Sequence, residues 1–301
     1  MAESVLFAGD GNIDLQFTGL ASPPQIDREV LCAEYAAAVG GSTTICAAAY
    51  STLGGRAEYC GLFGDDDNGR HMERMLRSAG VGLHLLRFTS ECATGVTVNL
   101  VHASTRTQVT YTGTLSIVDE TDTIKREIRN YAHLHLAGIY PLDRFLPRVT
   151  EVLGAARAAG VTTSVTTQWD STQEWKHLAD WLPLLTYLFV NEEEARSITH
   201  RSCIEDAYAD LAARTECPLI TRGASGAFAR GRTTPGVPVT VRDTTGAGDT
   251  FAAGFLFAVM EKHMPVDEAV RYGCAAGALS CTYTGGVSSE LRHDRVMNLL
   301  S

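Results

Sequence analysis

The sequence is short of basic residues and has no long apolar runs. Its 301 residues include 25 Lys and Arg against 35 Asp and Glu, which gives a formal net charge of -10 at pH 7. This balance argues against a protein that wraps nucleic acid or lies on an anionic membrane, because both tasks need clustered positive charge. No stretch stays apolar and uncharged for the roughly 20 residues that a membrane-spanning helix requires. The sequence therefore predicts neither a nucleic-acid partner nor a membrane partner.

Paired cysteines and an export signal are also missing. The eight cysteines are scattered, several lie among Ala and Val, and none forms a C-x-x-C pair. Such a pattern is typical of reduced, buried thiols rather than of a disulfide framework or a zinc site. The N-terminal residues MAESVLFAGDGN carry no basic segment and reach a turn after three apolar residues, unlike a signal peptide. We expect a cytoplasmic protein.

Short strand-like runs alternate with helical patterns along most of the chain. With 45% hydrophobic residues, a chain of this length can bury a large core. Strands separated by helices indicate a mainly parallel sheet with helices on both faces. A long helix is expected from residue 246 to about 262, followed by one final helix within residues 266–286. The absence of internal repeats and of low-complexity linkers predicts a single domain, residues 1–301.

Two segments interrupt this alternation. Residues 95–113 alternate β-branched with polar side chains around a Ser-Thr-Arg-Thr turn, which is typical of a hairpin. Residues 14–27 are also strand-like and contain a Pro-Pro turn. We expect both to form a small antiparallel lid beside the main sheet, from about residues 14–38 and 93–116.

The run DTTGAGDTFAAGF, residues 243–255, places glycines and two aspartates just before an apolar helix. The start of a helix offers unpaired N–H groups and the positive end of the helix dipole, and glycines let an anion approach them. Gly246, Ala247 and Gly248 would form such an amide cradle. Asp249 would then be a general base beside a transferring phosphoryl group, or simply a first-turn acid that favours the helix dipole.

This run resembles the C-terminal signature of the ribokinase-like carbohydrate kinases, the PfkB family. Other segments match in the order of that family and cover nearly the whole chain: GDGNID, the Gly-Gly pair at 40–41, LGGRAEYCGLFGDDDNG, NEEE and LITRGASGAF. The resemblance implies a ribokinase-like three-layer α/β sandwich with a small β-strand lid. It also implies transfer of the γ-phosphoryl group of ATP to a hydroxyl of a small carbohydrate.

The same resemblance assigns roles to residues around the nucleotide. It implies that Asp249 is the catalytic base and that the amides of residues 246–248 form the anion hole. Asn191 and Glu194 match the motif that places Mg²⁺, largely through water, although an acidic helix start capped by Asn191 would also explain them. Thr221 and Gly223 match positions along the ATP phosphates and ribose, or else mark a plain exit from a strand.

For the acceptor and a possible second ion, further positions are implied. Asn12, Asp14, Gly41 and Ser42 match sugar contacts of the family, and neutral and acidic groups suit vicinal hydroxyls. Turn chemistry after Gly11 is the alternative for Asn12 and Asp14. Asp243 and Thr245 resemble positions that hold a monovalent cation such as K⁺ in many members. Lid strands of relatives often pair between subunits, which implies a homodimer.

Departures from the family pattern leave the acceptor open. Ile45 stands where the family usually carries Asn, and Thr166 and Gln168 stand where relatives often show Asp-x-Asn. The acceptor therefore need not be ribose or a typical hexose. A nucleoside kinase is one alternative, since Trp169 and Phe17 could accept a base. A non-catalytic sugar or nucleotide sensor is the other.

Overall fold

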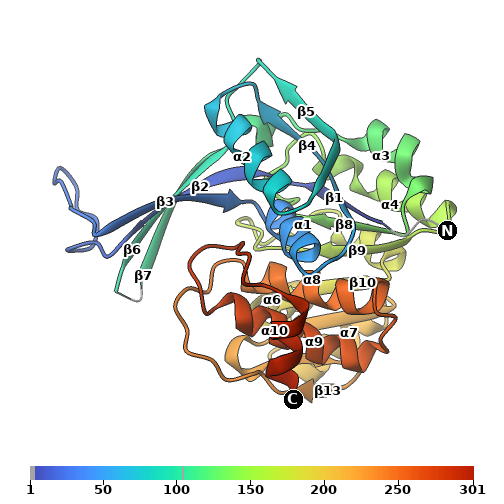
Figure 1. The fold of residues 1–301 in the computed structure, drawn as a ribbon. Coiled ribbons are helices and arrows are strands. Elements are labelled where there is room, and N and C mark those ends of the chain that lie inside the picture. Colours follow the sequence, from blue (N-terminus) through green and yellow to red (C-terminus); the bar gives the residue numbers. More distant parts are fainter. Residues whose placement is uncertain (1–3, 104) are drawn as a thin grey trace.

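The computed structural model describes residues 4–103 and 105–301, whose strands form two sheets (Figure 1). The larger sheet has nine strands in the order β13-β12-β11-β10-β9-β8-β1-β4-β5. All neighbours from β11 to β5 pair in parallel, and only β12 and β13 are antiparallel additions at one edge. The strands are β1 (Val5–Gly9), β4 (Ala57–Gly64), β5 (Gly82–Thr89), β8 (His133–Ala137), β9 (Thr162–Thr166), β10 (Tyr187–Asn191), β11 (Cys217–Thr221), β12 (Ala227–Ala229) and β13 (Arg232–Thr234).

Helices cover both faces of this sheet, because its strands are apolar on both sides. In β1, Val5 and Phe7 join one core whereas Leu6 and Ala8 join the other, as the two-residue repeat of a strand requires. The first core includes side chains of α1 (Ser42–Thr52), α2 (Asp67–Ser78), α8 (Ala247–Met260), α9 (Val266–Ser280) and α10 (His293–Leu300). The second includes side chains of α3 (Thr121–Glu127), α4 (Val149–Ala158), α5 (Leu178–Trp181), α6 (Glu192–Thr199) and α7 (Ile204–Ala212). The predicted three-layer α/β sandwich is confirmed.

The second sheet is the lid, which extends away from the layered body (Figure 1). Its order is β3-β2-β6-β7, with β2 (Asn12–Thr18), β3 (Glu34–Gly40), β6 (Val96–His102) and β7 (Thr105–Tyr111). The expected small separate sheet is confirmed, but an antiparallel flap is wrong, because the central strands β2 and β6 pair in parallel. Both leave the body in the same direction, and only the outer pairs are antiparallel. Residues 113–116 belong to the body, where Leu115 is buried in the second core.

Some elements escape the sequence patterns. β5 and α3 were not expected, and the prediction of one final helix is wrong because α10 follows α9. α10 has eight residues, too few for a helical repeat to stand out. Of the eight free thiols, Cys46, Cys60 and Cys274 are buried as expected, whereas Cys32 is exposed. None of the helices within residues 4–103 and 105–301 has the length and apolarity to span a bilayer.

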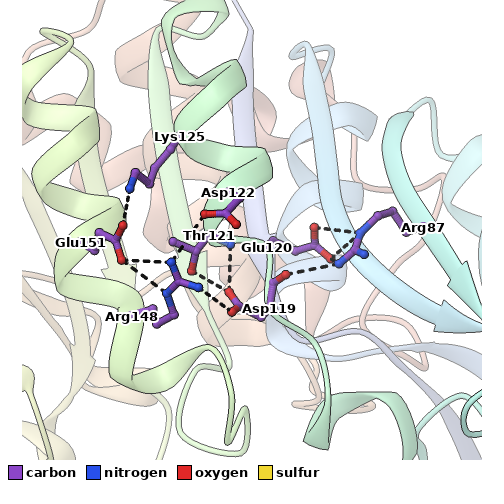
Figure 2. A network of polar contacts seen from close by, with 8 residues as sticks. All are labelled: Arg87, Asp119, Glu120, Thr121, Asp122, Lys125, Arg148 and Glu151. Atoms are coloured by element: carbon purple, nitrogen blue, oxygen red, sulfur yellow. Dashed lines mark hydrogen bonds and ion pairs between the residues drawn. The ribbon is translucent and has the colours of Figure 1, made fainter.

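A network of charged groups fixes the edge of the body around residues 119–122 (Figure 2). Arg87 of β5 pairs with Glu120 at 2.6 Å between Nη2 and Oε1, and Glu120 is almost fully buried. Arg148, at the start of α4, contacts Asp119 and Glu151, each at 3.2 Å. Burial raises the pKa of Glu120, and the hydrogen bonds from Arg87 oppose that rise. The network joins β5, α3 and α4, so its role is structural.

Candidate active site

The start of α8 is open to the outside. Gly246 precedes the helix in a left-handed conformation (φ 72°), and no side chain of the described residues caps it. A Cβ at Gly246 would lie 2.9 Å from Ile45 Cγ2 and 3.0 Å from Gly286 Cα, so the position requires glycine. A Cβ at Gly248 would meet nothing within 4 Å. The Ala247 N–H already donates to Thr244 O (3.2 Å). The remaining amides of this first turn face an accessible space.

A cleft of ≈ 180 Å³ lies against this helix start. Several of its lining residues end β9, β10 and β11, the edge of an open α/β sheet where ligands bind. It gathers most residues predicted around the nucleotide: Asn191, Glu194, Thr221, Gly246, Ala247, Gly248 and Asp249. Gly223 is not among its lining residues and forms a turn (φ 55°) after β11.

Asn191 and Glu194 form a capping box at the start of α6. Asn191 Oδ1 accepts from the Glu194 N–H (2.8 Å), and Glu194 Oε2 accepts from the Asn191 N–H (2.9 Å). Thr167 Oγ1 also donates to Glu194 Oε2 (3.1 Å). The capping interpretation is therefore confirmed, and the same two residues line the cleft. Burial raises the pKa of Glu194, and its hydrogen bonds oppose that rise.

Ser42 connects the starts of α1 and α8. Its hydroxyl donates to Asp249 Oδ1, so the predicted sugar contact is bonded to the predicted base. Gly41, which precedes α1 with φ 88°, has no side chain to cap that helix. The carboxylate of Asp10 caps α1 instead: it accepts hydrogen bonds from the N–H groups of Ser42 (2.9 Å) and Thr43 (2.8 Å). Sequence reasoning missed Asp10, although an acid in a Gly-Asp-Gly turn at the end of a strand is a usable signal.

Acidic groups around Asp249 control its proton affinity. Burial raises the pKa of Asp249 to about 7; the charges of Asp10, Glu194 and Asp14 add to that rise, and the Ser42 hydrogen bond opposes it. Burial likewise raises the pKa of Asp14 to about 6. A carboxylate with a pKa near neutral can take up a proton from an alcohol and release it again at physiological pH.

Asn12 and Asp14 lie at the base of the lid, in β2. Both are buried, and Asn12 Nδ2 donates to Asp14 Oδ1 (2.9 Å) and to Thr97 Oγ1 (3.1 Å). Asp14 is close enough to Asp249 for each charge to act on the other. The structure therefore brings two of the predicted acceptor contacts near the predicted base. They are part of an ordered polar cluster rather than of a solvated turn.

A larger cleft of ≈ 670 Å³ lies between the lid and the loop before α8. Its lining includes Asn99 and Arg106 of the lid, both missed by sequence reasoning, and Arg106 Nη1 donates to Thr245 Oγ1 (3.1 Å). Asp243 accepts from the N–H (2.9 Å) and Oγ1 (2.7 Å) of Thr245 and from the Gly285 N–H (2.9 Å). Asp243 thus joins two loops beside this cleft. Arg106 was visible in the sequence only as a turn residue.

The residues that depart from the family pattern have clear positions. Ile45 is buried and packs between Gly246 and Gly286. Thr166 and Gln168 line the smaller cleft, together with Asn191 and Glu194, rather than the cleft under the lid. Trp169 is partly exposed and meets the edge of the Trp175 ring at 5.8 Å between centroids.

The chain is similar to known proteins in both sequence and fold. The profile described as "pfkB family carbohydrate kinase" matches residues 2–293. An ATP-dependent ribose-1-phosphate kinase of Halopiger xanaduensis is 31% identical over 294 residues, 95% of this chain and 94% of the relative. An aminoimidazole riboside kinase of Salmonella typhimurium is 30% identical over 285 residues, 87% and 88% of the two chains. The structure of Arabidopsis thaliana ribokinase complexed with ribose and ATP has the same fold, with a TM-score of 0.85 and 23% sequence identity. The match covers 100% of this chain and 99% of the ribokinase chain.

Proposed function

The chain belongs to the pfkB family of carbohydrate kinases, and we propose that Asp249 is the general base with which it phosphorylates a ribosyl-containing acceptor. Its general activity is ATP-dependent phosphotransfer to an alcohol group. The position of Asp249 in the first turn of an uncapped helix is the observation that supports its role. Its pKa of about 7 and its hydrogen bond from Ser42 agree with that role.

The reaction can be written with the groups of this site. The acceptor hydroxyl oxygen forms a bond to the γ-phosphorus of ATP while the bond from that phosphorus to the β,γ-bridging oxygen breaks, and ADP leaves with the electron pair. The hydroxyl proton passes to the carboxylate of Asp249. The amides of Gly246 and Gly248 stabilise the charge on the transferring group, since the Ala247 N–H is engaged with Thr244 O. Closure of the lid excludes water as a competing acceptor. Proton release from Asp249 restores the base.

We propose that the nucleotide phosphates and Mg²⁺ bind at the smaller cleft. No three His, Cys, Asp or Glu side chains in the described part of the chain are grouped closely enough for an all-protein metal site. Mg²⁺ usually keeps several waters and borrows one or two carboxylates together with substrate phosphates. Glu194 and Asn191 suit this arrangement, with Thr221 and Gly223 along the nucleotide. When bound, the ion would neutralise charge on the phosphates; Glu194→Gln should raise the Mg²⁺ concentration needed for half-maximal rate.

The ribosyl acceptor is supported by chemistry at the base of the lid. Buried Asn12, Asp14 and the start of α1 at Gly41 and Ser42 offer donors and acceptors for vicinal hydroxyls. Relatives named for ribose 1-phosphate and for a riboside share that unit. A nucleoside acceptor is the second candidate, favoured by the relative named for a riboside. A panel of ribose, ribose 1-phosphate and adenosine, assayed for ADP formation, separates the candidates.

A monovalent cation is proposed beside the loops that Asp243 joins. Asp243 holds residues 243–245 against the loop of Gly285, beside the start of α8. Activity should rise when K⁺ replaces tetramethylammonium at constant ionic strength. Equal rates in the two salts would contradict the cation.

A homodimer through the lid is proposed from the exposure of apolar side chains. Tyr35, Val109 and Tyr111 are 60%, 61% and 53% exposed on the outward face of the lid sheet, an arrangement typical of a protein–protein contact. Val109→Asp should shift the sedimentation coefficient from dimer to monomer, whereas Met297→Asp on α10 should not. A wild-type monomer at micromolar concentration would reject the dimer. We also propose a cytoplasmic location, where ATP is available.

Asp249→Asn tests the central proposal. The amide cannot accept the proton, so kcat should fall by at least ~100-fold, the scale of general-base catalysis, while ATP still binds. Thermal unfolding and nucleotide titration control for misfolding. A variant that keeps more than a tenth of wild-type kcat would show that another group takes the proton. A sensor protein, the remaining alternative, would turn over none of the panel even as wild type.

A further inference from the structure

We propose that the inner face of the lid holds an anion-binding subsite, so that the acceptor is a sugar carrying a phosphate group rather than a free sugar. The inference rests on the proposed kinase function and specifies its substrate class. It is carried by Asn99 and Arg106, two donor side chains at the ≈ 670 Å³ cleft that the reaction steps above do not use.

The two faces of the lid sheet differ in chemistry. Strand register aligns Gln16 with Asn99 and Asn99 with Gln108, so these three polar side chains form a row on one face. The alternating residues of the same strands, such as Phe17 and Val98, form the apolar opposite face. The polar face is the better buried: Gln16 and Asn99 are 4% and 2% exposed. Burial of a polar side chain costs free energy unless the group forms hydrogen bonds. A buried polar face is therefore more typical of a binding surface than of a packed core.

Asn99 has an unpaired donor in this buried row. Its Oδ1 accepts from Gln108 Nε2 (2.8 Å), whereas Nδ2 makes no hydrogen bond of normal geometry within the described residues. The Asn99 side chain still influences Asp14, whose pKa it lowers against the rise caused by burial. Buried donors without a partner are rare in folded proteins, and they mark places where a ligand or a water completes the bonding. Asn99 also lines the cleft, but Nδ2 itself is covered, so an acceptor oxygen on a bound molecule would reach this amide once the side chain turns toward the cleft.

Arg106 adds a positive charge at the same cleft. Its guanidinium donates to the neutral hydroxyl of Thr245, next to the start of α8. Its charge also reaches Asp14, where it partly opposes the rise in pKa that burial causes. The guanidinium therefore lies between the acceptor contacts and the anion cradle. A planar group with five N–H donors suits phosphate oxygens better than a single hydroxyl.

The lining of the cleft favours a phosphate over a nucleobase. Of the described residues that line it, none is aromatic, so a base would find no ring to stack on. Two acids share the lining: Asp243 is engaged by three donors, and Glu34 accepts from Thr18 Oγ1 (3.5 Å). The second arginine of the lining, Arg242, adds positive charge from the opposite wall. A phosphate on the acceptor would replace Thr245 as the partner of Arg106 and pair with Asn99 Nδ2.

Kinetics with paired acceptors test the subsite. We expect wild-type enzyme to use a pentose phosphate, ribose 1-phosphate or ribose 5-phosphate, at least 10-fold better in kcat/KM than ribose. Arg106→Gln should lower kcat/KM for the phosphorylated acceptor by about 10- to 100-fold, the range for a hydrogen bond to a charged group. The loss should appear in KM, with the rate on ribose unchanged within about twofold. Arg77→Gln, at an exposed arginine of α2, controls for the loss of one positive charge.

Binding and folding controls keep the result interpretable. Asn99→Ala should weaken binding of the same pentose phosphate in calorimetry without lowering the unfolding temperature by more than a few degrees. Preference for ribose or adenosine over both pentose phosphates, or an unchanged KM in Arg106→Gln, would overturn the subsite. If Asp249→Asn is inactive on the preferred acceptor while Arg106→Gln shows no selective loss, only the subsite fails. If Asp249→Asn stays active, the proposed base fails, whatever the Arg106 result.

Discussion

Removal of the Ser42 hydroxyl should change the pH dependence of the enzyme more than its maximal rate. Ser42 donates to Asp249 Oδ1, a bond that stabilises the ionised carboxylate and lowers its pKa against the effect of burial. Ser42→Ala should therefore raise the pKa of Asp249 above its value of about 7. A general base acts only when ionised, so the acidic limb of the pH profile should move to higher pH.

The size of the shift follows from the strength of the bond. A hydrogen bond to a charged group contributes about 1.5–3 kcal/mol, and one pKa unit corresponds to about 1.4 kcal/mol. Because Asp249 is only partly buried, water can replace the lost hydroxyl, and we expect a shift of about one unit. At pH 6 the ionised fraction would fall from about 9% to about 1%, a roughly tenfold loss of rate. At pH 9 both proteins would be at least about 90% ionised, and the rates would be nearly equal.

The assay is kcat/KM for ATP at saturating acceptor between pH 5.5 and 9, which reports the enzyme before ATP binds. Ser42→Thr keeps a hydroxyl and serves as the control, with a profile close to wild type. An equal loss at pH 6 and pH 9 would mean that Ser42 contacts the acceptor instead, as the sequence first suggested. A profile unchanged by either substitution would refute the link between this hydroxyl and the base.

Three further perturbations separate catalysis from folding. Gly246→Ala places a Cβ at positive φ beside Ile45, so unfolding should become easier by at least about 1 kcal/mol and kcat should fall more than tenfold, measured by denaturation and steady-state kinetics. Glu120→Gln breaks the ion pair with Arg87, so the free energy of unfolding should fall by about 1–2 kcal/mol. The loss is no larger because half of the Arg87 side chain is exposed, and kcat should be unchanged. In native protein, Cys32 should react with a thiol reagent well before the buried thiols, which should react only on unfolding.

The layers of the fold were predictable because its signals are local. Strand-like runs predicted β1, β4, β8, β9, β10 and β11, most of them beside a glycine, and the segment 243–255 predicted the start of α8. The parallel pairing of β2 with β6 was not predictable, because it joins segments about 80 residues apart that enter the lid from the same side of the body. Such pairing depends on the direction of each strand in space, which no local pattern records.

The candidate site was predictable in its residues but not in its bonds. Asp249, Asn191 and Glu194 follow from motifs, yet the bond from Ser42 to Asp249 joins residues 207 apart in sequence. Asp10 lies in the GDGNID segment and Arg106 in the expected Ser-Thr-Arg-Thr turn, but neither was assigned a role, because each acts through a partner on another element. Contacts of this kind depend on side chains that meet only after the layers and the lid have packed.

The acids around Asp249 make its pKa sensitive to the charge of the bound substrates. Asp10, Asp14 and Glu194 all raise the pKa of Asp249, and a bound nucleotide would bring further negative charge to the same cleft. Unless that charge is offset, it would raise the pKa of Asp249 further and lower the ionised fraction of the base at neutral pH. A divalent cation arriving with ATP acts on the nucleotide side, and Arg106 acts on the acceptor side, where it already favours the ionised form of Asp14. The divalent cation would therefore offset the nucleotide charge that reaches Asp249, and Arg106 would offset the charge of the acceptor phosphate near Asp14.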